Sequence, residues 1–337
     1  MKHGAEVAAF ERELASYLGA KYCVALCNGT ATLHTALVAL GIDGGSEVAT
    51  TPLSMSATTL AILHAGALPV FVDIDPDTWT MGDDTNAYDA WLPVSLYGLH
   101  TDIGGSAVID DAAQTFRFNK SAAFTSLSFQ ASKLLSTGEG GALLTNSEEL
   151  ATKAREFSSL GYRMSATQAR IDSATLKAPD FTRHYQVGFN YRMNDCTAAL
   201  GLKQLANIDV LKQIRLECAA MYREAIQGCE WVKPQFVPAG SHHDYWCYAM
   251  ACDTPERALA LQADVVKHGG EMPYGAWRLS YQEPAFKHPV FDQTIFGTPL
   301  VGHCPNAESL QPRLLQMQTN CLESAQRNAR ALRKALS

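Results

Sequence analysis

The sequence has few positively charged residues and no cluster of them. Its 337 residues include 27 Lys and Arg against 34 Asp and Glu, which gives a formal net charge of −7. Because nucleic acids are bound mainly through Lys and Arg contacts to phosphates, this scarcity argues against a nucleic-acid partner. The longest uncharged run, residues 48–72, is broken by Pro52, Gly66 and Pro69. We therefore expect buried core there and no membrane partner.

Signals for secretion and for metal binding are also missing. Residues 1–23 mix charges of both signs and lack the apolar segment of a secretion signal, so we expect a cytoplasmic protein. The nine cysteines are odd in number and scattered, which indicates reduced thiols. No Cys or His pairs have zinc-site spacing, and the adjacent His242 and His243 cannot complete a coordination shell. The sequence therefore predicts no metal site.

Short apolar runs and helical patterns alternate through the first part of the chain. Strands are predicted for 21–26, 47–51, 69–75, 90–96, 106–111, 124–129 and 140–146, and helices for 28–41 and 57–66. Such alternation is typical of a mostly parallel sheet with helices on both faces. The sequence therefore predicts a large α/β unit.

The pattern changes from about Asn194. Helices are predicted over most of 195–228, over 255–269 and over 321–337, with strand signals near 245–252. We therefore divide the chain into a large domain of residues 1–205 and a smaller α+β domain of residues 206–337. The segment 161–186, rich in Ser, Thr and Arg, is predicted to be a long loop, and loops of that length in compact enzymes are often functional.

Two strand ends carry residues suited to ligand binding. Gly29 and Thr30 stand between a strand and a helix start, where unpaired N–H groups and the helix dipole favour a phosphate. Alternatively, Thr30 is only the helix N-cap and Gly29 supplies the turn. Asp110 and Asp111 end the strand 106–111 and point to opposite faces, so one of them can address a ligand at the carboxyl edge of the sheet. A solvated strand end or a helix N-cap is the alternative.

Lys133 stands between a small-residue run and the glycine-rich turn 137–141. A lysine near buried surface loses its charge readily and becomes a nucleophile suited to a Schiff base with a carbonyl. The alternative is a solvated turn lysine. Farther along, the segment 188–195 places Asn190 beside two aromatic residues just before a long helix, where a capping role for Asn194 or Asp195 is the alternative.

The order and spacing of these motifs resemble those of one known family. The series is NGT (28–30), DIDP (73–76), DAAQ (111–114), SFQASK (128–133), TGEGG (137–141) and GFNYRM (188–193) before AALGLKQL (198–205). It resembles the DegT/DnrJ/EryC1/StrS family of pyridoxal-phosphate-dependent sugar aminotransferases. The resemblance covers nearly the whole chain and implies the type I aminotransferase fold, with a large, mostly parallel-sheet domain and a smaller α+β C-terminal domain.

The resemblance implies a role for each matching residue. Lys133 corresponds to the lysine that bonds to the cofactor, pyridoxal phosphate, and later moves a proton. Asp111, which directly precedes AAQ, corresponds to the carboxylate that keeps the pyridine nitrogen protonated. The other cofactor contacts implied are Ala113 on a ring face, Gln114 on the phenolic oxygen, Gly29, Thr30, Ala31 and Ser128 on the phosphate, Asn190 on the phosphate of the neighbouring subunit, and Met55 where relatives have a stacking aromatic.

The implied reaction moves an amino group from glutamate or glutamine to a keto group of a nucleotide-linked sugar, giving an amino sugar for surface glycans or related products. The role of Asn190 implies a homodimer with shared active sites. A branch of the family that dehydrates sugars has histidine in place of the cofactor lysine, so the presence of Lys133 favours amino transfer. Two alternatives stay open: a non-catalytic or regulatory cofactor-binding protein, and an aminotransferase for another ketone such as a cyclitol.

Several departures from the family pattern weaken the assignment of the substrate. Met55 offers a thioether instead of an aromatic ring, and Asn28 replaces the more common serine. The chain starts later than most relatives, and residues 96–111 are compressed. For the diphosphate we expect a surface formed by the basic residues Lys153, Arg155, Arg163, Arg170, Lys177, Arg183 and Arg192. The alternative is an exposed loop whose arginines only maintain solubility.

Overall fold

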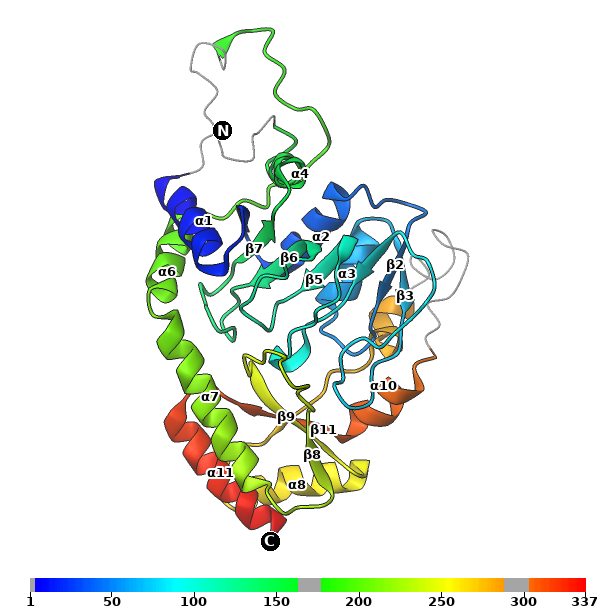
Figure 1. The fold of residues 1–337 in the computed structure, drawn as a ribbon, viewed down its shortest axis with the longest axis vertical. Helices are drawn as coiled ribbons and strands as arrows, with labels where there is room; N and C mark the ends of the chain where they lie inside the picture. The colour runs from blue at the N-terminus through cyan, green and yellow to red at the C-terminus, as the bar shows by residue number, and fades with distance from the viewer. Residues whose placement is uncertain (1–3, 163–176, 288–302) are drawn as a thin grey trace.

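Two β-sheets, each with its own helices, make up the structure in Figure 1, a computed structural model that describes residues 4–162, 177–287 and 303–337. The large sheet has the order β1-β7-β6-β5-β4-β2-β3. Its strands are β1 (Tyr22–Leu26), β2 (Glu47–Thr50), β3 (Leu68–Phe71), β4 (Ala90–Leu92), β5 (Gly105–Asp111), β6 (Ala122–Ser128) and β7 (Gly141–Thr145). β7 runs opposite to the strands on both sides of it, β1 and β6, and the pairs from β6 to β3 are parallel, which confirms the predicted mostly parallel sheet.

Helices cover both faces of the large sheet. One face packs against α1 (Ala5–Leu18) and α6 (Asp195–Leu205), and the other against α2 (Gly29–Ala39), α3 (Ala57–His64) and α4 (Glu148–Ser158). Side chains of β1 alternate between the two cores: Cys23 lies in the core under α1, and Val24 lies in the core under α2. Because both faces are buried, the strands read as continuous apolar runs in the sequence.

Short polar side chains begin several of the helices. Ser147, Asn194 and Thr254 each accept a hydrogen bond from the backbone N–H three residues farther on. Asn194 is therefore the cap of α6. Asp195 instead accepts a hydrogen bond from the N–H of Val7 at 3.1 Å, which ties α6 to α1.

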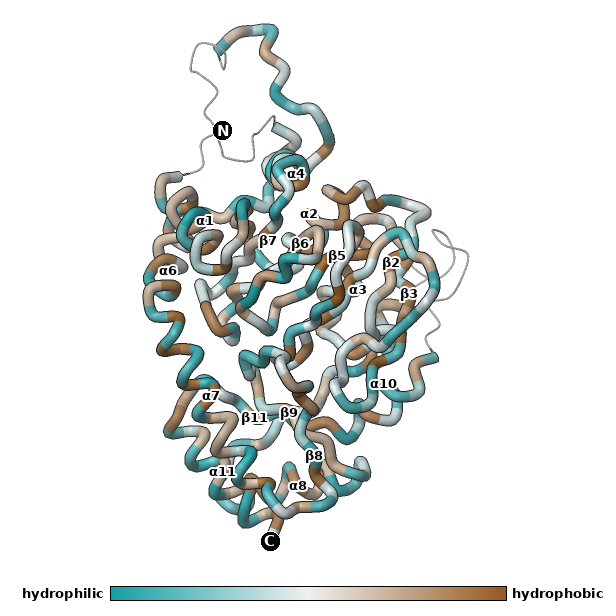
Figure 2. Tube along the Cα trace, viewed as in Figure 1, coloured by the Kyte–Doolittle hydropathy of each residue, from teal (hydrophilic) through white to brown (hydrophobic). Residues whose placement is uncertain are grey.

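A second unit contains an antiparallel sheet of order β10-β11-β9-β8. Its elements are α7 (Ile208–Ala225), β8 (Val232–Pro234), β9 (Cys247–Cys252), α8 (Pro255–Lys267), β10 (Tyr274–Gly275), β11 (Leu314–Gln318) and α11 (Leu322–Leu336). Hydrophobic and hydrophilic residues alternate along α7 and α11, as expected for helices that bury one face (Figure 2). The predicted helix over 195–228 is two helices, separated by Ala206 and Asn207. The division after residue 205 stays a prediction.

A separate hydrophobic cluster joins the two units. It contains Leu53, Trp79 and Tyr97 from the large unit and Cys247 and Ala249 from β9. The short helix α10 (Pro305–Leu310) also belongs to this cluster. All nine cysteines are free thiols, as predicted. Among the described residues, no helix is both long enough and apolar enough to cross a membrane.

Candidate active site

Asp111 lies buried at the carboxyl end of β5. Its two oxygens accept hydrogen bonds from the hydroxyl of Thr58 at 2.7 Å and from the N–H of Ala113 at 3.2 Å. Burial raises the pKa of Asp111, whereas these hydrogen bonds and the charge of Lys133 lower it. Asp111 and Lys133 therefore act on each other electrostatically.

Asp110 points to the other face of β5, into a separate polar cluster. Its Oδ1 accepts a hydrogen bond from the hydroxyl of Ser95 at 2.9 Å, and its Oδ2 lies 3.8 Å from Nδ1 of His100. Burial raises the pKa of Asp110 to about 8 and lowers the pKa of His100 to about 4. Both side chains are therefore largely uncharged at pH 7, and the choice of Asp111 over Asp110 stays a prediction.

The start of α2 packs closely against the end of β6 and the start of β7. A Cβ added to Gly29 would stand 2.9 Å from the Cβ of Ser128. A Cβ added to Gly141 would stand 2.8 Å from the backbone of Asn28. Glycine is thus required at both positions, because any side chain would push these three segments apart. The close approach forms a cradle in which the hydroxyl of Ser128 lies beside the first turn of α2.

Asn28 is the N-cap of α2, and its side chain accepts the N–H of Ala31 at 2.8 Å. The alternative in which Thr30 is the cap is therefore wrong. Within the described residues, the N–H groups of Gly29 and Thr30 donate no hydrogen bond. Two unpaired donors at the positive end of a helix are suited to an anion.

Lys133 lies in the segment that connects β6 to β7, and its Nζ is 4.6 Å from the ring centroid of Trp246. Burial lowers the pKa of Lys133 to about 8. Asp111 and Cys247 act in the opposite direction, and Arg215 lowers the pKa further. Lys133 is partly buried, and its lowered pKa means that its amine gives up its proton more readily than an exposed one.

The other three residues predicted to contact the cofactor ring, Gln114, Met55 and Ala113, lie in different surroundings. Gln114 is buried, and its side-chain oxygen accepts the N–H of Tyr97, which leaves its amide NH₂ as the group that can donate. Met55 is 48% exposed and lies just before α3, the helix whose Thr58 holds the carboxylate. Ala113 is half-buried at the turn that follows β5.

The GFNYRM segment runs beside the start of α2. The carbonyl of Tyr191 accepts the N–H of Cys27 at 2.7 Å, and Arg192 pairs with Leu26 at the end of β1. Asn190 is exposed at this position. Nη1 of Arg192 is buried without a hydrogen-bond partner among the described residues.

The prediction that Arg155 belongs to a diphosphate-binding surface is wrong. This side chain is buried, and its Nη2 lies 2.9 Å from an oxygen of Glu11 in the interior. Lys153 is exposed and pairs with Glu149 at 2.8 Å. Arg163 and Arg170 lie outside the described residues.

Three residues next to the site were not predicted from the sequence. Thr58 holds Asp111, whereas Arg215 and Trp246 surround the Lys133 segment. A hydroxyl at the start of a helix is a weak signal for Thr58. No signal pointed to Arg215 or Trp246, because both come from the second unit.

A cavity of about 500 Å³ opens beside the Lys133 segment. Its lining includes Ser132, the aromatic side chains of Trp246, Tyr274 and Trp277, and the amide of Gln316. Aromatic walls with a few polar groups are typical of sites for small organic ligands.

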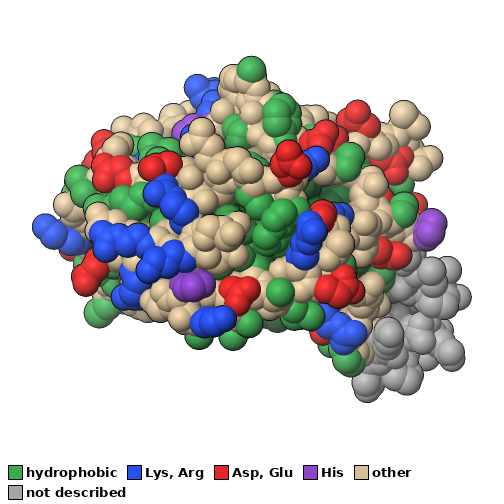
Figure 3. Space-filling model, turned by 90° about the horizontal axis from the view of Figure 1, so that it is seen from below, with side chains coloured by type: hydrophobic (Ala, Val, Ile, Leu, Met, Phe, Trp, Pro, Cys, Tyr) green, Lys and Arg blue, Asp and Glu red, His purple; other side chains and the backbone are tan. Residues whose placement is uncertain are grey.

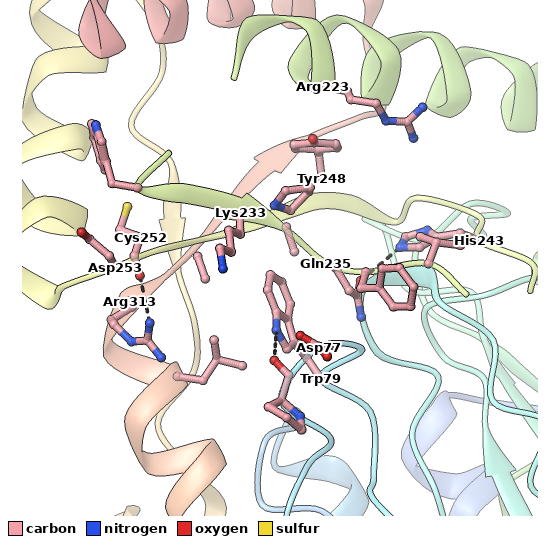
Figure 4. Close-up of a pocket in the computed structure, with 18 of the residues that line it drawn as sticks. Asp77, Trp79, Arg223, Lys233, Gln235, His243, Tyr248, Cys252, Asp253 and Arg313 are labelled. Carbon is pink, nitrogen blue, oxygen red and sulfur yellow. Dashed lines mark hydrogen bonds between the residues drawn. The ribbon is translucent and has the colours of Figure 1, made fainter. Parts of the chain in front are cut away.

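A larger cavity of about 860 Å³ lies between the loop that carries Trp79 and the edge strand β8. Figure 4 shows Lys233 extending into it between Trp79 and Arg313. None of the predicted site residues lines it. Its lining includes three basic and three acidic side chains. On the face of α8 and α11 as well, charges of both signs are interspersed (Figure 3).

The groups around Asp111 and Lys133 fit a phosphorylated aromatic aldehyde. The helix start with its two unpaired N–H groups and Ser128 can take the phosphate, the buried carboxylate can hold a protonated ring nitrogen, and the lysine can bond to the aldehyde.

Known proteins resemble the chain along most of its length. Residues 1–326 match the model of the DegT/DnrJ/EryC1/StrS aminotransferase family. The spore coat polysaccharide biosynthesis protein SpsC of Bacillus subtilis (strain 168) is 34% identical, over 94% of this chain and 85% of SpsC. GDP-perosamine synthase of Caulobacter vibrioides is 33% identical, over 73% of this chain and 69% of that enzyme. The crystal structure of NtdA from Bacillus subtilis with bound cofactor PMP has a TM-score of 0.83 at 25% identity and covers 99% of this chain and 78% of NtdA.

Proposed function

Because the chain belongs to the DegT/DnrJ/EryC1/StrS aminotransferase family, we propose that it transfers an amino group from glutamate or glutamine to a keto group of a nucleotide-linked sugar. Pyridoxal phosphate is the cofactor. The observation that carries the proposal is that a hydrogen-bonded buried carboxylate, Asp111, and an amine of lowered pKa, Lys133, influence each other electrostatically. Perturbed acid and base groups held together are typical of active sites.

Each group of the chain has a defined task in this proposal. When bound, pyridoxal phosphate supplies an electron sink for the carbon next to the transferred nitrogen. Asp111 keeps the ring nitrogen protonated, and Thr58 orients that carboxylate. Nζ of Lys133 would carry a proton between the substrate carbon and the cofactor carbon that flank the transferred nitrogen. Gly29, Thr30, Ala31 and Ser128 bind the phosphate.

Two observations support a sugar as the acceptor of the amino group. GDP-perosamine synthase, a relative that covers most of this chain, is named for an amino-sugar product. The cavity beside Lys133 has three aromatic side chains against which the apolar face of a sugar ring can pack. Of the proposed diphosphate surface, Lys177, Arg183 and Arg192 remain as described candidates.

We propose a cytoplasmic homodimer with shared sites. Val187 is 90% exposed and Phe189 is 45% exposed, directly beside Asn190. Apolar side chains that are exposed together favour a protein partner. A second copy of the chain would cover them and bring its Asn190 to the phosphate.

Glutamate added to the purified holoenzyme tests the amino transfer. The visible absorbance of the bound cofactor should fall as the amino group is transferred, and a panel of keto-sugar nucleotides should restore it. Recovery with one acceptor identifies the sugar. Absorbance that no amino donor changes would instead favour the regulatory alternative, and recovery only with a cyclitol ketone would favour that substrate.

Mixed dimers test whether the sites are shared. The variants Lys133→Ala and Asn190→Ala are each expected to be weakly active or inactive as homodimers. If one site takes Lys133 from one subunit and Asn190 from the other, a mixed dimer has one site with both native residues. Activity should then return when the two variants are refolded together. Sites contained within one subunit would give no recovery.

A further inference from the structure

The peptide group between Ser132 and Lys133 is held at both ends. Its N–H, from Lys133, donates to the carbonyl of Gln130 at 2.9 Å. Its carbonyl, from Ser132, accepts hydrogen bonds from Nη2 of Arg215 at 3.1 Å and from Nε1 of Trp246 at 3.2 Å. Because a peptide group is planar, these bonds fix the direction in which the lysine side chain leaves the backbone.

Arg215 is buried in α7, yet the described part of the chain offers it no carboxylate within ion-pair distance. Its guanidinium instead donates to Ser132, to the carbonyl of Trp246 at 2.6 Å and to the hydroxyl of Thr319 at 3.1 Å. These hydrogen bonds satisfy the buried guanidinium in place of a carboxylate, and one of them goes to the lysine segment. This arginine connects the lysine segment directly to the second unit.

Trp246 contributes a ring face as well as a hydrogen bond. Nζ of Lys133 lies 4.6 Å from its ring centroid, and Trp277 stacks nearby with a centroid distance of 5.9 Å. A cation over an indole face is stabilised by the ring electrons. The groups that face Lys133 are thus Asp111 from β5, Cys247 and Trp246 at the start of β9, and Arg215 from α7.

We propose that Arg215 and Trp246 are positioning residues for Lys133, which hold its peptide group through the Ser132 carbonyl and set the charge environment of its amine from the second unit. This inference rests on the proposed function, in which Lys133 bonds to the cofactor. The two residues oppose each other: the ring face favours the charged amine, and the nearby guanidinium disfavours it. Removing one or the other should therefore change the acidity of Lys133 in opposite directions.

The test follows the rate at which the full-length apoenzyme recombines with pyridoxal phosphate as a function of pH. Only the uncharged amine reacts, so the rate should rise with pH to a plateau. The pH midpoint of this rise should lie at the pKa of Lys133, about 8 in the native protein. Trp246→Leu should move this point down by about one unit, the shift that corresponds to a cation–π contribution of roughly 0.5–2 kcal/mol. Arg215→Met should move it up.

Conservative variants separate position from charge. Trp246→Phe keeps a ring face but loses the hydrogen bond to Ser132, so the pH midpoint should stay while the plateau rate falls. Arg215→Lys keeps the charge without the forked donors and should behave in the same way. Lys212→Met, on the same helix, and Trp231→Leu, in the same unit, are the controls and should leave midpoint and plateau unchanged.

The outcomes distinguish this inference from the proposed function. A native apoenzyme that gains no visible absorbance with pyridoxal phosphate refutes the proposed function itself. If the native apoenzyme recombines, unchanged plateau rates in Trp246→Phe and Arg215→Lys refute the positioning role. Equal midpoints in Trp246→Leu and Trp246→Phe, or midpoint shifts in the same direction for Trp246→Leu and Arg215→Met, refute the effect on the charge of Lys133. If Arg215→Met does not fold, the two Trp246 variants and Arg215→Lys still decide the question.

Discussion

Replacing Thr58 by valine tests how the buried carboxylate is kept charged. The hydroxyl of Thr58 donates to Oδ2 of Asp111 at 2.7 Å, and it also bonds to Ser54 at 2.8 Å. Valine keeps the shape and removes the donor. Hydrogen bonds to charged groups contribute about 1.5–3 kcal/mol. The holoenzyme needs Asp111 charged against the ring nitrogen, so it should lose this stabilisation in full.

The apoenzyme loses less, because burial already raises the pKa of Asp111 and the free carboxylate can take up a proton. The difference should appear as weaker cofactor binding, by about ten- to a hundredfold. The assay is a titration of apoenzyme with pyridoxal phosphate, followed by visible absorbance.

Two controls accompany this prediction. Thr58→Ser keeps the donor and should bind the cofactor like the native protein. Ser54→Ala removes the other partner of Thr58 and measures what that hydrogen bond contributes by itself. A folded Thr58→Val variant with native affinity would refute the reasoning, since Asp111 would then need no donor to stay charged.

Three further predictions follow from other described groups. Lys133→Ala should abolish turnover but still bind the amine form of the cofactor, and turnover near the native rate would remove Lys133 from its role. Glu11→Gln should lower the free energy of unfolding by about 3–5 kcal/mol in urea titrations, because it replaces the carboxylate that pairs with the buried guanidinium of Arg155 by a neutral amide. Asp110 keeps its proton up to about pH 8 in the folded state but only up to about pH 3.8 when unfolded, so its contribution to the free energy of unfolding is present in acid and is lost as the pH rises between these values. Asp110→Asn should make the free energy of unfolding fall less over this pH range. An unchanged pH profile of unfolding would contradict this prediction.

Local signals allowed much of the fold and part of the site to be predicted. Strand ends place Asp111 and Ser128 at the same sheet edge, and Asn194 caps α6 as its position suggests. Each of these depends on residues close in sequence. Asn28 was missed as the cap of α2, since Thr30 also has a side chain suited to that role.

Long-range contacts explain most of what the sequence did not reveal. Arg215 and Trp246 meet Ser132 across 83 and 114 positions of the chain. Arg155 was expected at the surface, but Glu11, 144 positions earlier, pairs with it in the interior. Charge and helical spacing describe one helix at a time, so they cannot tell which distant partner will neutralise a charge.

The pairing of β6 with β7 has a consequence for how this protein could change over evolution. Ser128 and Gly141 are partners in the ladder, so the segment with Lys133 leaves the sheet and returns to it at the same rung. Insertions or deletions between these two positions would displace Lys133 from the contacts that Arg215 and Trp246 make with Ser132. We therefore expect the number of residues between Ser128 and Gly141 to stay constant while surrounding surface loops vary in length.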